Sequence, residues 1–313
     1  MDSPLLRRPG AVAADPPDVG VAAHYGDPYR EQRELAAGSA LVDLSHRPVL
    51  RIAGPDRLSW LHSLTTQHLE HVAPGVTVDA LVLSPQGHVE HHLRLRDNGE
   101  AVLAVVEPGT AAALLAFLDR MRFLLRVEVS EATDQLAMTS GGLIPRADLA
   151  GYDGPLAGVL AAEALRIAAR EPRLGRDTDH RSLPNESTWL RTAVHLDKGC
   201  YRGQETVARV WNLGRPPRRT VLLHLDGSGS DLPATGDPVL LGDREVGRVG
   251  SVARHYELGP IALGLVRRAV PDDAELLAGG VPARIDPVPD DLPESPARGA
   301  AAARSGLLRP PRP

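Results

Sequence analysis

Hydrophobic and polar positions alternate with two different periods along the chain, and these periods predict a mixture of helices and antiparallel strands. Leucines spaced three apart after Gly54-Pro55-Asp56 predict a helix, and strict alternation from Val89 to Arg96 predicts a strand. Ser84-Pro85-Gln86-Gly87 suits a type I turn that joins this strand to an earlier one as a hairpin. Further helices are expected over 28–37, 110–121 and 157–170, and further strands over 40–45, 48–53, 80–83, 101–106 and 124–129. This arrangement indicates the α+β class rather than a doubly wound sheet.

The pattern changes at a basic, proline-containing stretch, 214–219, which we interpret as a stiff linker. Short β-like runs follow at 221–225, 239–241, 245–249 and 261–265. Both ends of the chain lack periodicity and are rich in proline and alanine. We therefore predict a disordered lead-in (1–22), an N-terminal region (23–214), a β domain (215–286) and a disordered tail (287–313).

Composition narrows the classes of function. A net charge of -5 argues against stable nucleic-acid binding. The single cysteine excludes an internal disulfide and a self-contained cysteine-ligated iron–sulfur cluster, which takes about four thiolates. No apolar stretch is typical of a signal peptide or of a membrane span. We expect a cytoplasmic protein of a reducing compartment, with no membrane partner.

That cysteine lies in a stretch whose neighbours favour a reactive thiol. Cys200 has Lys198 and Arg202 two positions to either side, and a short helix is expected over 204–211. Nearby cations and a helix N-terminus both lower a thiol pKa, so we predict an accessible and acidic Cys200. Gly203 and the glycine before the cysteine predict unusual backbone angles or a ligand close to the main chain.

The same stretch carries a resemblance to a known family. It reads Lys198-Gly199-Cys200-Tyr201-Arg202-Gly203-Gln204-Glu205. It resembles the K-G-C-[FY]-x-G-Q-E signature of the YgfZ family of folate-binding proteins, relatives of the glycine-cleavage T-protein, an aminomethyltransferase. Weaker similarity runs from about His24 to about Arg268, and two β-like segments resemble recurring strands of the T-protein's C-terminal barrel, Val246 to Ser251 and Ile261 to Leu263.

This resemblance implies a three-lobed T-protein-like fold, with two folate-binding lobes over 23–214 and a C-terminal β-barrel over 215–286. It implies tetrahydrofolate or a derivative as the cofactor, and support for the synthesis or repair of iron–sulfur enzymes, which would be client partners. The implied catalytic residues are Cys200 and Lys198. The implied folate contacts are Tyr201, Gly203, Gln204, Glu205 and Arg209.

Two departures from the T-protein pattern argue against aminomethyl transfer. The T-protein's G-x-V-x-D-D segment corresponds to Gly87 to His92, where both aspartates are replaced by His91 and His92. The R-D-x-L-R-x-E pattern has lost its first arginine and its glutamate around 162–168. Adjacent strand residues point to opposite faces, so His91 and His92 cannot readily share a metal, and we expect no metal site.

Several residues and functions stay open at this stage. Basic residues at 215, 218 and 219 suit RNA, the glutamate tail of a folate or a solvated linker, and the linker is favoured over RNA. Trp60 and Trp211 suit either a pterin pocket or a core. Three functions remain: a folate-dependent accessory factor for iron–sulfur enzymes, a folate-dependent aminomethyl- or methyltransferase, and a partner-binding module that needs no folate.

Overall fold

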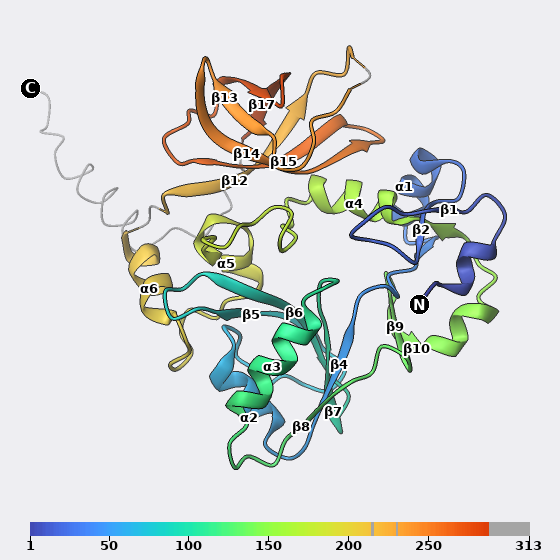
Figure 1. The fold of residues 1–313 in the computed structure, drawn as a ribbon, viewed down its shortest axis with the longest axis vertical. Helices are drawn as coiled ribbons and strands as arrows, with labels where there is room; N and C mark the ends of the chain where they lie inside the picture. The colour runs from blue at the N-terminus through green and yellow to red at the C-terminus, as the bar shows by residue number, and fades with distance from the viewer. Residues whose placement is uncertain (214–215, 230, 288–313) are drawn as a thin grey trace, which may run out of the picture.

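The computed structural model describes residues 1–213, 216–229 and 231–287, which form three lobes around a common centre (Figure 1). An antiparallel sheet with its helices makes the first lobe. Helices α1 (Pro28–Ala36) and α4 (Val159–Ala168) with short strand pairs make the second, and a closed β-barrel makes the third. Separate sheets and interspersed helices confirm the predicted α+β class.

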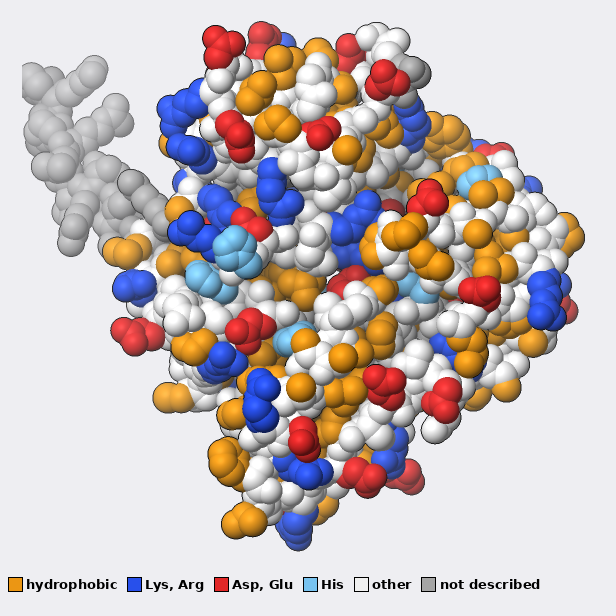
Figure 2. Space-filling view, viewed as in Figure 1, with side chains coloured by type: hydrophobic (Ala, Val, Ile, Leu, Met, Phe, Trp, Pro, Cys, Tyr) orange, Lys and Arg blue, Asp and Glu red, His pale blue; other side chains and the backbone are white. Residues whose placement is uncertain are grey.

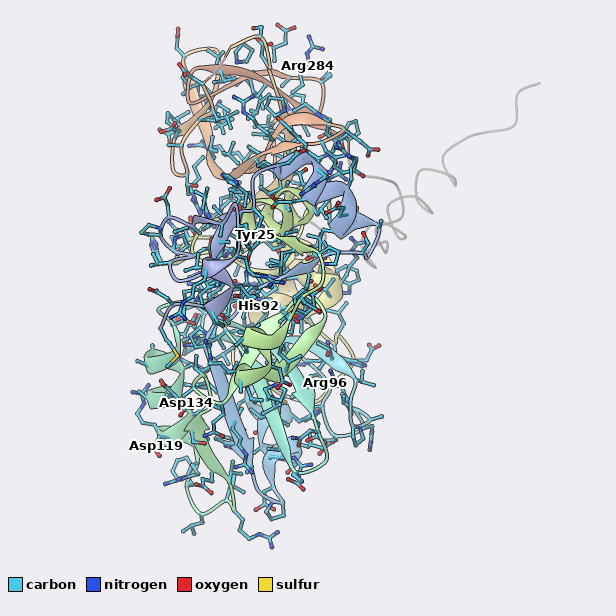
Figure 3. All side chains as sticks on the ribbon, turned by 90° about the vertical axis from the view of Figure 1, so that its right-hand side faces the viewer. Tyr25, His92, Arg96, Asp119, Asp134 and Arg284 are labelled. Atoms are coloured by element: carbon cyan, nitrogen blue, oxygen red, sulfur yellow. The ribbon has the colours of Figure 1, made fainter. Side chains whose placement is uncertain are left out.

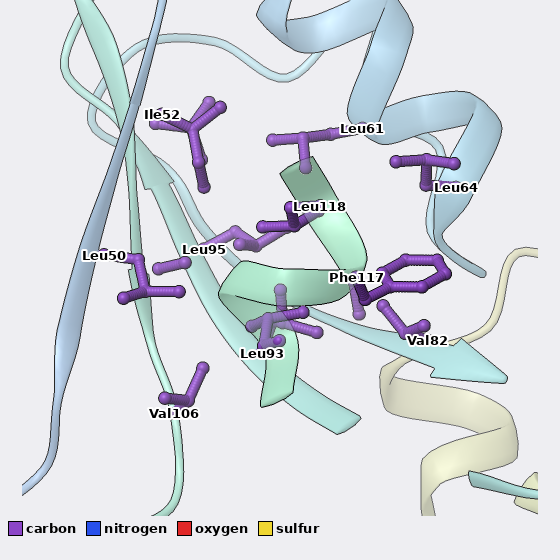
Figure 4. Close-up of a cluster of buried hydrophobic side chains, with 14 of the residues drawn as sticks. Leu50, Ile52, Leu61, Leu64, Val82, Leu93, Leu95, Val106, Phe117 and Leu118 are labelled. Atoms are coloured by element: carbon purple, nitrogen blue, oxygen red, sulfur yellow. The ribbon is translucent and has the colours of Figure 1, made fainter. Parts of the chain in front are cut away.

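The first lobe is a five-stranded sheet covered by two helices. Its strands lie in the order β5 (Thr77–Leu83), β6 (Val89–Asp97), β7 (Ala101–Val105), β4 (Val49–Ala53) and β8 (Glu128–Glu131). Helices α2 (Arg57–Leu64) and α3 (Ala111–Met121) pack on one face, where leucines such as Leu93 and Leu118 have no exposed surface (Figure 4). Burying one such side chain contributes about 2 kcal/mol, so this core fixes the helices on the sheet.

The hairpin of β5 and β6 forms as its sequence predicts. Residues along β6 alternate between buried and more exposed positions. The turn closes through the Gly87 N–H, which donates to the Ser84 carbonyl over 2.9 Å, and Gly87 has a φ of +83°. A register shift between Val82 and Leu83 shows that the strand is bulged beside this turn.

Residues 1–22 are ordered, so the predicted disordered lead-in is wrong. They contain η1 (Pro4–Arg7) and β1 (Val12–Ala13), which pairs with β2 (Ala22–His24). Leu5 is buried against residues of the second lobe, and Val21 is fully buried. The partners of Leu5, Ala137 and Leu149, lie more than a hundred residues away in the chain, so local periodicity gives no sign of this packing.

The second lobe joins this segment to the middle of the chain. Its strands pair as β3 (Leu41–Val42) with β11 (Leu156–Ala157), in parallel, and as the hairpin of β9 (Leu136–Thr139) with β10 (Gly142–Pro145), which the sequence analysis missed. A short helix, η2 (Arg146–Gly151), follows the hairpin. Helix α1 begins as predicted, with the Asp27 carboxylate accepting the Arg30 N–H over 3.0 Å.

Three short helices connect the lobes to the barrel and hold the cysteine stretch. They are η3 (Pro184–Glu186), α5 (Trp189–Thr192) and α6 (Gln204–Leu213), and α6 confirms the helix predicted after the glycine. Figure 1 shows α5 and α6 beside β5 and β6. Within the described ranges, no helix has both the length and the apolar character that crossing a bilayer requires.

The C-terminal barrel is closed and confirms the predicted β domain. Its order is β12 (Arg218–Leu225), β15 (Gly259–Arg267), β14 (Arg244–His255), β13 (Pro238–Leu241), β16 (Glu275–Ala278) and β17 (Val281–Asp286). The last two strands were not predicted. Arg218 and Arg219 belong to β12 and not to a linker, whereas 214–215 and the predicted tail from 288 onward lie outside the described residues.

Candidate functional site

Cys200 lies exposed in the segment between α5 and α6, and its predicted accessibility is confirmed. The neighbouring cations are engaged elsewhere. The Arg202 guanidinium pairs with the Glu90 carboxylate at 3.2 Å, and Lys198 is buried. The acidity of the thiol therefore stays a prediction, resting on position in the sequence.

Lys198 braces the end of α2. Its ammonium donates to the carbonyls of His62, Thr65 and Gln67, the last two over 2.6 and 3.0 Å. A cation at a helix C-terminus satisfies carbonyls that have no partner within the helix and complements the helix dipole. Burial lowers the pKa of Lys198 to about 8, an effect that the Glu70 carboxylate opposes. Lys198 thus fastens the cysteine segment to the sheet lobe.

Tyr201 and Gln204 fasten the segment from its other side. Tyr201 is buried in a cluster with Leu81 and Trp189, and its ring centroid lies 5.2 Å from the Lys198 ammonium. Burial raises the pKa of the Tyr201 phenol to about 12. The Gln204 side-chain amide donates to the Lys198 carbonyl over 3.3 Å. Side chains that the resemblance assigns to folate here hold the polypeptide in place.

Gly203 is the point of closest approach between this segment and the hairpin turn. It has a φ of +81°, and a Cβ at this position would lie 2.5 Å from the Ser84 carbonyl oxygen. Gly87 faces it, because a Cβ there would lie 2.8 Å from the Thr206 Cβ. The predicted unusual backbone angle is present at Gly203, and the group that approaches its main chain is the turn between β5 and β6.

Glu205 and Arg209 lie exposed on α6, four positions apart and therefore on one face of the helix. The structure therefore gathers Lys198, Cys200, Tyr201, Gly203 and Gln204 into one braced segment. It leaves Glu205 and Arg209 on the adjacent helix surface.

His91 and His92 occupy opposite faces of β6, as predicted. His91 pairs with Val82 on the face that packs under α2 and α3, and burial lowers its pKa. His92 pairs with Leu81 on the other face, stacks on Trp189 with ring centroids 5.1 Å apart, and has Nε2 3.2 Å from an Asp79 carboxylate oxygen.

Two of the residues left open by the sequence analysis, Arg218 and Trp60, have structural partners. Arg218 donates to both Asp179 and Glu186, so it joins the barrel to the segment before α5. Trp60 is buried and its indole N–H donates to the Met121 carbonyl over 3.1 Å, which places it in the core of the first lobe. Trp211 is partly exposed on α6.

A buried charge network joins all three lobes, and the sequence analysis missed it. Arg173, with 2% of its side chain exposed, contacts Asp18 at 2.5 Å, Glu107 at 2.7 Å and Glu163 at 3.4 Å. We call this the junction cluster; its members are Asp18, His46, Glu107, Glu163, Arg166, Arg173, Asp177 and Ser251. The density of arginine and aspartate over 173–179 was the available signal.

Arg166 carries the junction cluster from α4 to the barrel. It forms ion pairs with Glu163 and Asp177, at 2.8 and 2.9 Å, and it donates to the Ser251 hydroxyl of β14 over 2.6 Å. These charged partners raise the pKa of Arg166, against the effect of burial. The α4 segment that resembles a degraded T-protein pattern is therefore an interlobe contact.

The surface is hollowed below the barrel, where the lobes meet. Figure 2 shows this hollow with basic side chains along its upper rim and histidines beside it. Figure 3 shows Tyr25 and His92 at this height, between Arg284 on the barrel and Asp119 at the far end. Within the described residues, Arg248 of β14 reaches the junction through the Arg176 carbonyl at 3.2 Å, and its Nε and Nη2 atoms are buried without a hydrogen-bond partner.

Those unpartnered donors point to a ligand with acceptor oxygens. A buried donor without a partner costs about 1–3 kcal/mol, and a guanidinium offers two parallel N–H groups that match a carboxylate. The site can therefore bind an anionic or carbonyl group beside the junction cluster. The exposed thiol lies on a separate segment.

Comparisons with known proteins agree with this architecture. Residues 218–293 match the family described as CAF17, C-terminal beta-barrel domain. A putative chloroplastic transferase of Arabidopsis thaliana is 23% identical over 291 residues, which cover 72% of this chain and 65% of that relative. An aminomethyltransferase of Moorella thermoacetica is 26% identical over 304 residues, covering 77% of this chain and 82% of the relative.

The solved structure of glycine cleavage system aminomethyltransferase T from Bartonella henselae superposes with a TM-score of 0.76. The match covers 94% of this chain and 98% of that chain, at 16% sequence identity. An extensive match at such low identity establishes architecture. The chain has the three-lobed T-protein-like fold with a C-terminal β-barrel, as the sequence analysis predicted.

Proposed function

We propose that this protein is a tetrahydrofolate-binding accessory factor that supports iron–sulfur enzymes, with Cys200 as its working thiol. The T-protein-like fold, the aminomethyltransferase relatives and the resemblance of residues 198–205 to the YgfZ signature support folate binding. The match of the barrel to the CAF17 family is consistent with a function other than aminomethyl transfer.

One observation carries the proposal: an exposed thiol on a segment that is braced on both sides. Lys198 fastens the segment to α2, Tyr201 is buried beneath it, and Gly203 packs on the hairpin turn. Holding a short connection this firmly costs conformational entropy that a simple loop does not need to lose. The cost has a purpose if the thiol must be presented in one position.

Cys200 acts without a second cysteine in its own chain. Three roles meet that condition: a mixed disulfide with a partner, a lone ligand to a cluster in transit, or a nucleophile toward a reactive species. In the first, the thiolate attacks a partner's disulfide, one new S–S bond forms, and the partner's second sulfur leaves as a thiolate. A reducing compartment such as the cytoplasm keeps Cys200 available for each role.

We propose that the folate binds beside the junction cluster, where the unpartnered donors of Arg248 suit the carboxylates of a glutamate tail. Aminomethyl transfer is not part of the proposal, because His91 and His92 replace the aspartates of the T-protein pattern. A buried imidazole with a lowered pKa does not supply the negative charge of a carboxylate. An assay with a glycine-derived aminomethyl donor and tetrahydrofolate is expected to give no transfer.

Complementation tests the working thiol. Cells that lack the protein are expected to lose activity of iron–sulfur enzymes, and Cys200→Ser is expected not to restore it although the variant folds. Leu196→Ala, a change at another exposed position of the same segment, serves as the matched control and should restore activity. If Cys200→Ser restores activity in full, Cys200 is not the working thiol. The signature would then act through its backbone and through Gln204 and Glu205.

A further inference from the structure

Histidines gather beside the braced segment, at a place that the proposed function does not use. His62 lies in the last turn of α2, and His68 and Glu70 lie in the connection that follows it. One potential ligand atom from each of these side chains lies within 4.8 Å of the other two. His62 and His68 are half-buried, and Glu70 is exposed.

Two more imidazoles surround His68. Its ring centroid lies 4.6 Å from that of His62, 5.3 Å from that of His195 and 5.4 Å from that of His71. His195 belongs to the segment that carries Cys200, so the group combines residues from two parts of the chain. Imidazole is the commonest metal ligand, so a group of this composition suits a metal ion.

The backbone that carries these side chains is fixed. The Lys198 ammonium binds the carbonyls of His62 and Gln67, and Leu69, between His68 and Glu70, is buried. The Leu69 N–H donates to His62 Nδ1 over 3.3 Å, which is long for a hydrogen bond. The imidazole of His62 can therefore give up this contact and bind a metal through Nδ1. A fixed backbone lowers the cost of arranging ligands around an ion.

We propose that His62, His68 and Glu70 form a binding site for a divalent transition-metal ion. Two imidazoles and one carboxylate are the ligand set of open zinc and non-haem iron(II) centres, so Zn²⁺ and Fe²⁺ are the ions whose preferences the site meets. Ligand atoms around a tetrahedral ion with bonds of about 2.1 Å lie about 3.4 Å apart, so small side-chain rotations complete the site.

Calorimetric titration of the metal-free, full-length protein with Zn²⁺ tests this site. We expect one ion per chain, with a dissociation constant in the micromolar range or below. Glu70→Gln keeps the size of an exposed side chain and should weaken binding at least tenfold, and His68→Ala should do the same. His180→Ala removes an exposed histidine from a different segment and should leave binding unchanged.

Circular dichroism and thermal unfolding without metal establish that each variant is folded. The wild type should gain thermal stability on addition of Zn²⁺, and Glu70→Gln should lose that gain. An anaerobic titration with Fe²⁺ decides which of the two ions binds more tightly. The proposal is overturned if Zn²⁺ and Fe²⁺ bind only at millimolar concentration, or if Glu70→Gln and His68→Ala bind as well as the wild type. These readouts involve neither folate nor Cys200, so they stand or fall apart from the proposed function.

Discussion

Lys198 and Cys200 are two residues apart, and the fold uses them in opposite ways. The Lys198 side chain turns inward to the carbonyls at the end of α2, whereas the Cys200 side chain is exposed. An ammonium that is fully committed to three acceptors has little freedom to follow a reacting thiol. We infer that Lys198 serves the thiol by positioning its segment.

Asp18 shows how a single residue can decide the stability of the lobe junction. Burial raises its pKa, but hydrogen bonds and charge from His46 and Arg173 outweigh this and hold the pKa well below its usual range. A carboxyl whose folded pKa is lowered stabilises the protein above its unfolded pKa of about 3.9, and this contribution is lost as the pH falls.

We therefore predict that Asp18→Asn makes the free energy of unfolding depend less steeply on pH under acidic conditions. Between pH 5 and pH 3, the wild type should lose free energy of unfolding more steeply than the variant, with a difference in slope of up to about 1.4 kcal/mol per pH unit below pH 4. Urea unfolding at several pH values measures this. Asp243→Asn, at an exposed turn, should keep the wild-type slope. Parallel profiles for Asp18→Asn and wild type would show that Asp18 is not held ionised.

At the scale of elements, the cysteine segment and the β5–β6 hairpin form one unit. Gly203 and Gly87 have positive φ values and meet backbone to backbone, so α6 is seated directly on the hairpin turn. A side chain at either position would push the two elements apart. The position of the thiol thus depends on a turn more than a hundred residues earlier in the chain.

Gly203→Ala tests this seating. The variant combines a strained φ with a Cβ that would overlap the Ser84 carbonyl oxygen, so we expect a loss of about 2 kcal/mol or more in the free energy of unfolding. Hydrogen exchange of the segment before α6 should accelerate. Gly199→Ala is the matched control, since a Cβ there meets nothing within 4 Å, and it should unfold like the wild type. Equal stability of the two variants would mean that the segment is not clamped.

Elements with strong local signals could be predicted from the sequence. The cap at Asp27, the turn at Ser84 to Gly87 and the alternation in β6 each predict structure that the molecule has. The short strands β16 and β17 and the β9–β10 hairpin were missed. They are stabilised by pairing with strands distant in the chain or by packing between lobes, and such contacts leave little periodicity.

The candidate site divides in the same way. The motif around Cys200 was visible because its residues are contiguous. The polar residues on either side of Cys200 also predict that the cysteine is exposed. The junction cluster was not visible, because its members come from distant parts of the chain: Asp18 and Arg173 lie 155 positions apart. His62, His68 and Glu70 are close in the sequence, and the sequence analysis overlooked them. Burial of so many charges becomes predictable only when their partners are known.

At the scale of the whole molecule, the junction cluster joins the lobes, and the hollow opens beside it (Figure 2). Each lobe has its own hydrophobic cluster, and smaller apolar clusters cross between lobes, as where Ile167 of α4 packs with Leu222 and Leu263 of the barrel. A ligand that bridges these surfaces gains contacts from more than one lobe. The proposed folate site rests on the unpartnered donors of Arg248.

Calorimetric titration of tetrahydrofolate, under anaerobic reducing conditions, tests this central claim most directly. We predict saturable binding of one molecule per chain and an accompanying rise in thermal stability. Cys200→Ser should bind as the wild type does, and Arg248→Met should bind about tenfold more weakly or worse, because a charge-assisted hydrogen bond contributes about 1.5–3 kcal/mol. The account is contradicted if millimolar tetrahydrofolate produces no heat of binding and no thermal shift. The protein would then present a braced thiol on a T-protein-like fold that works without folate.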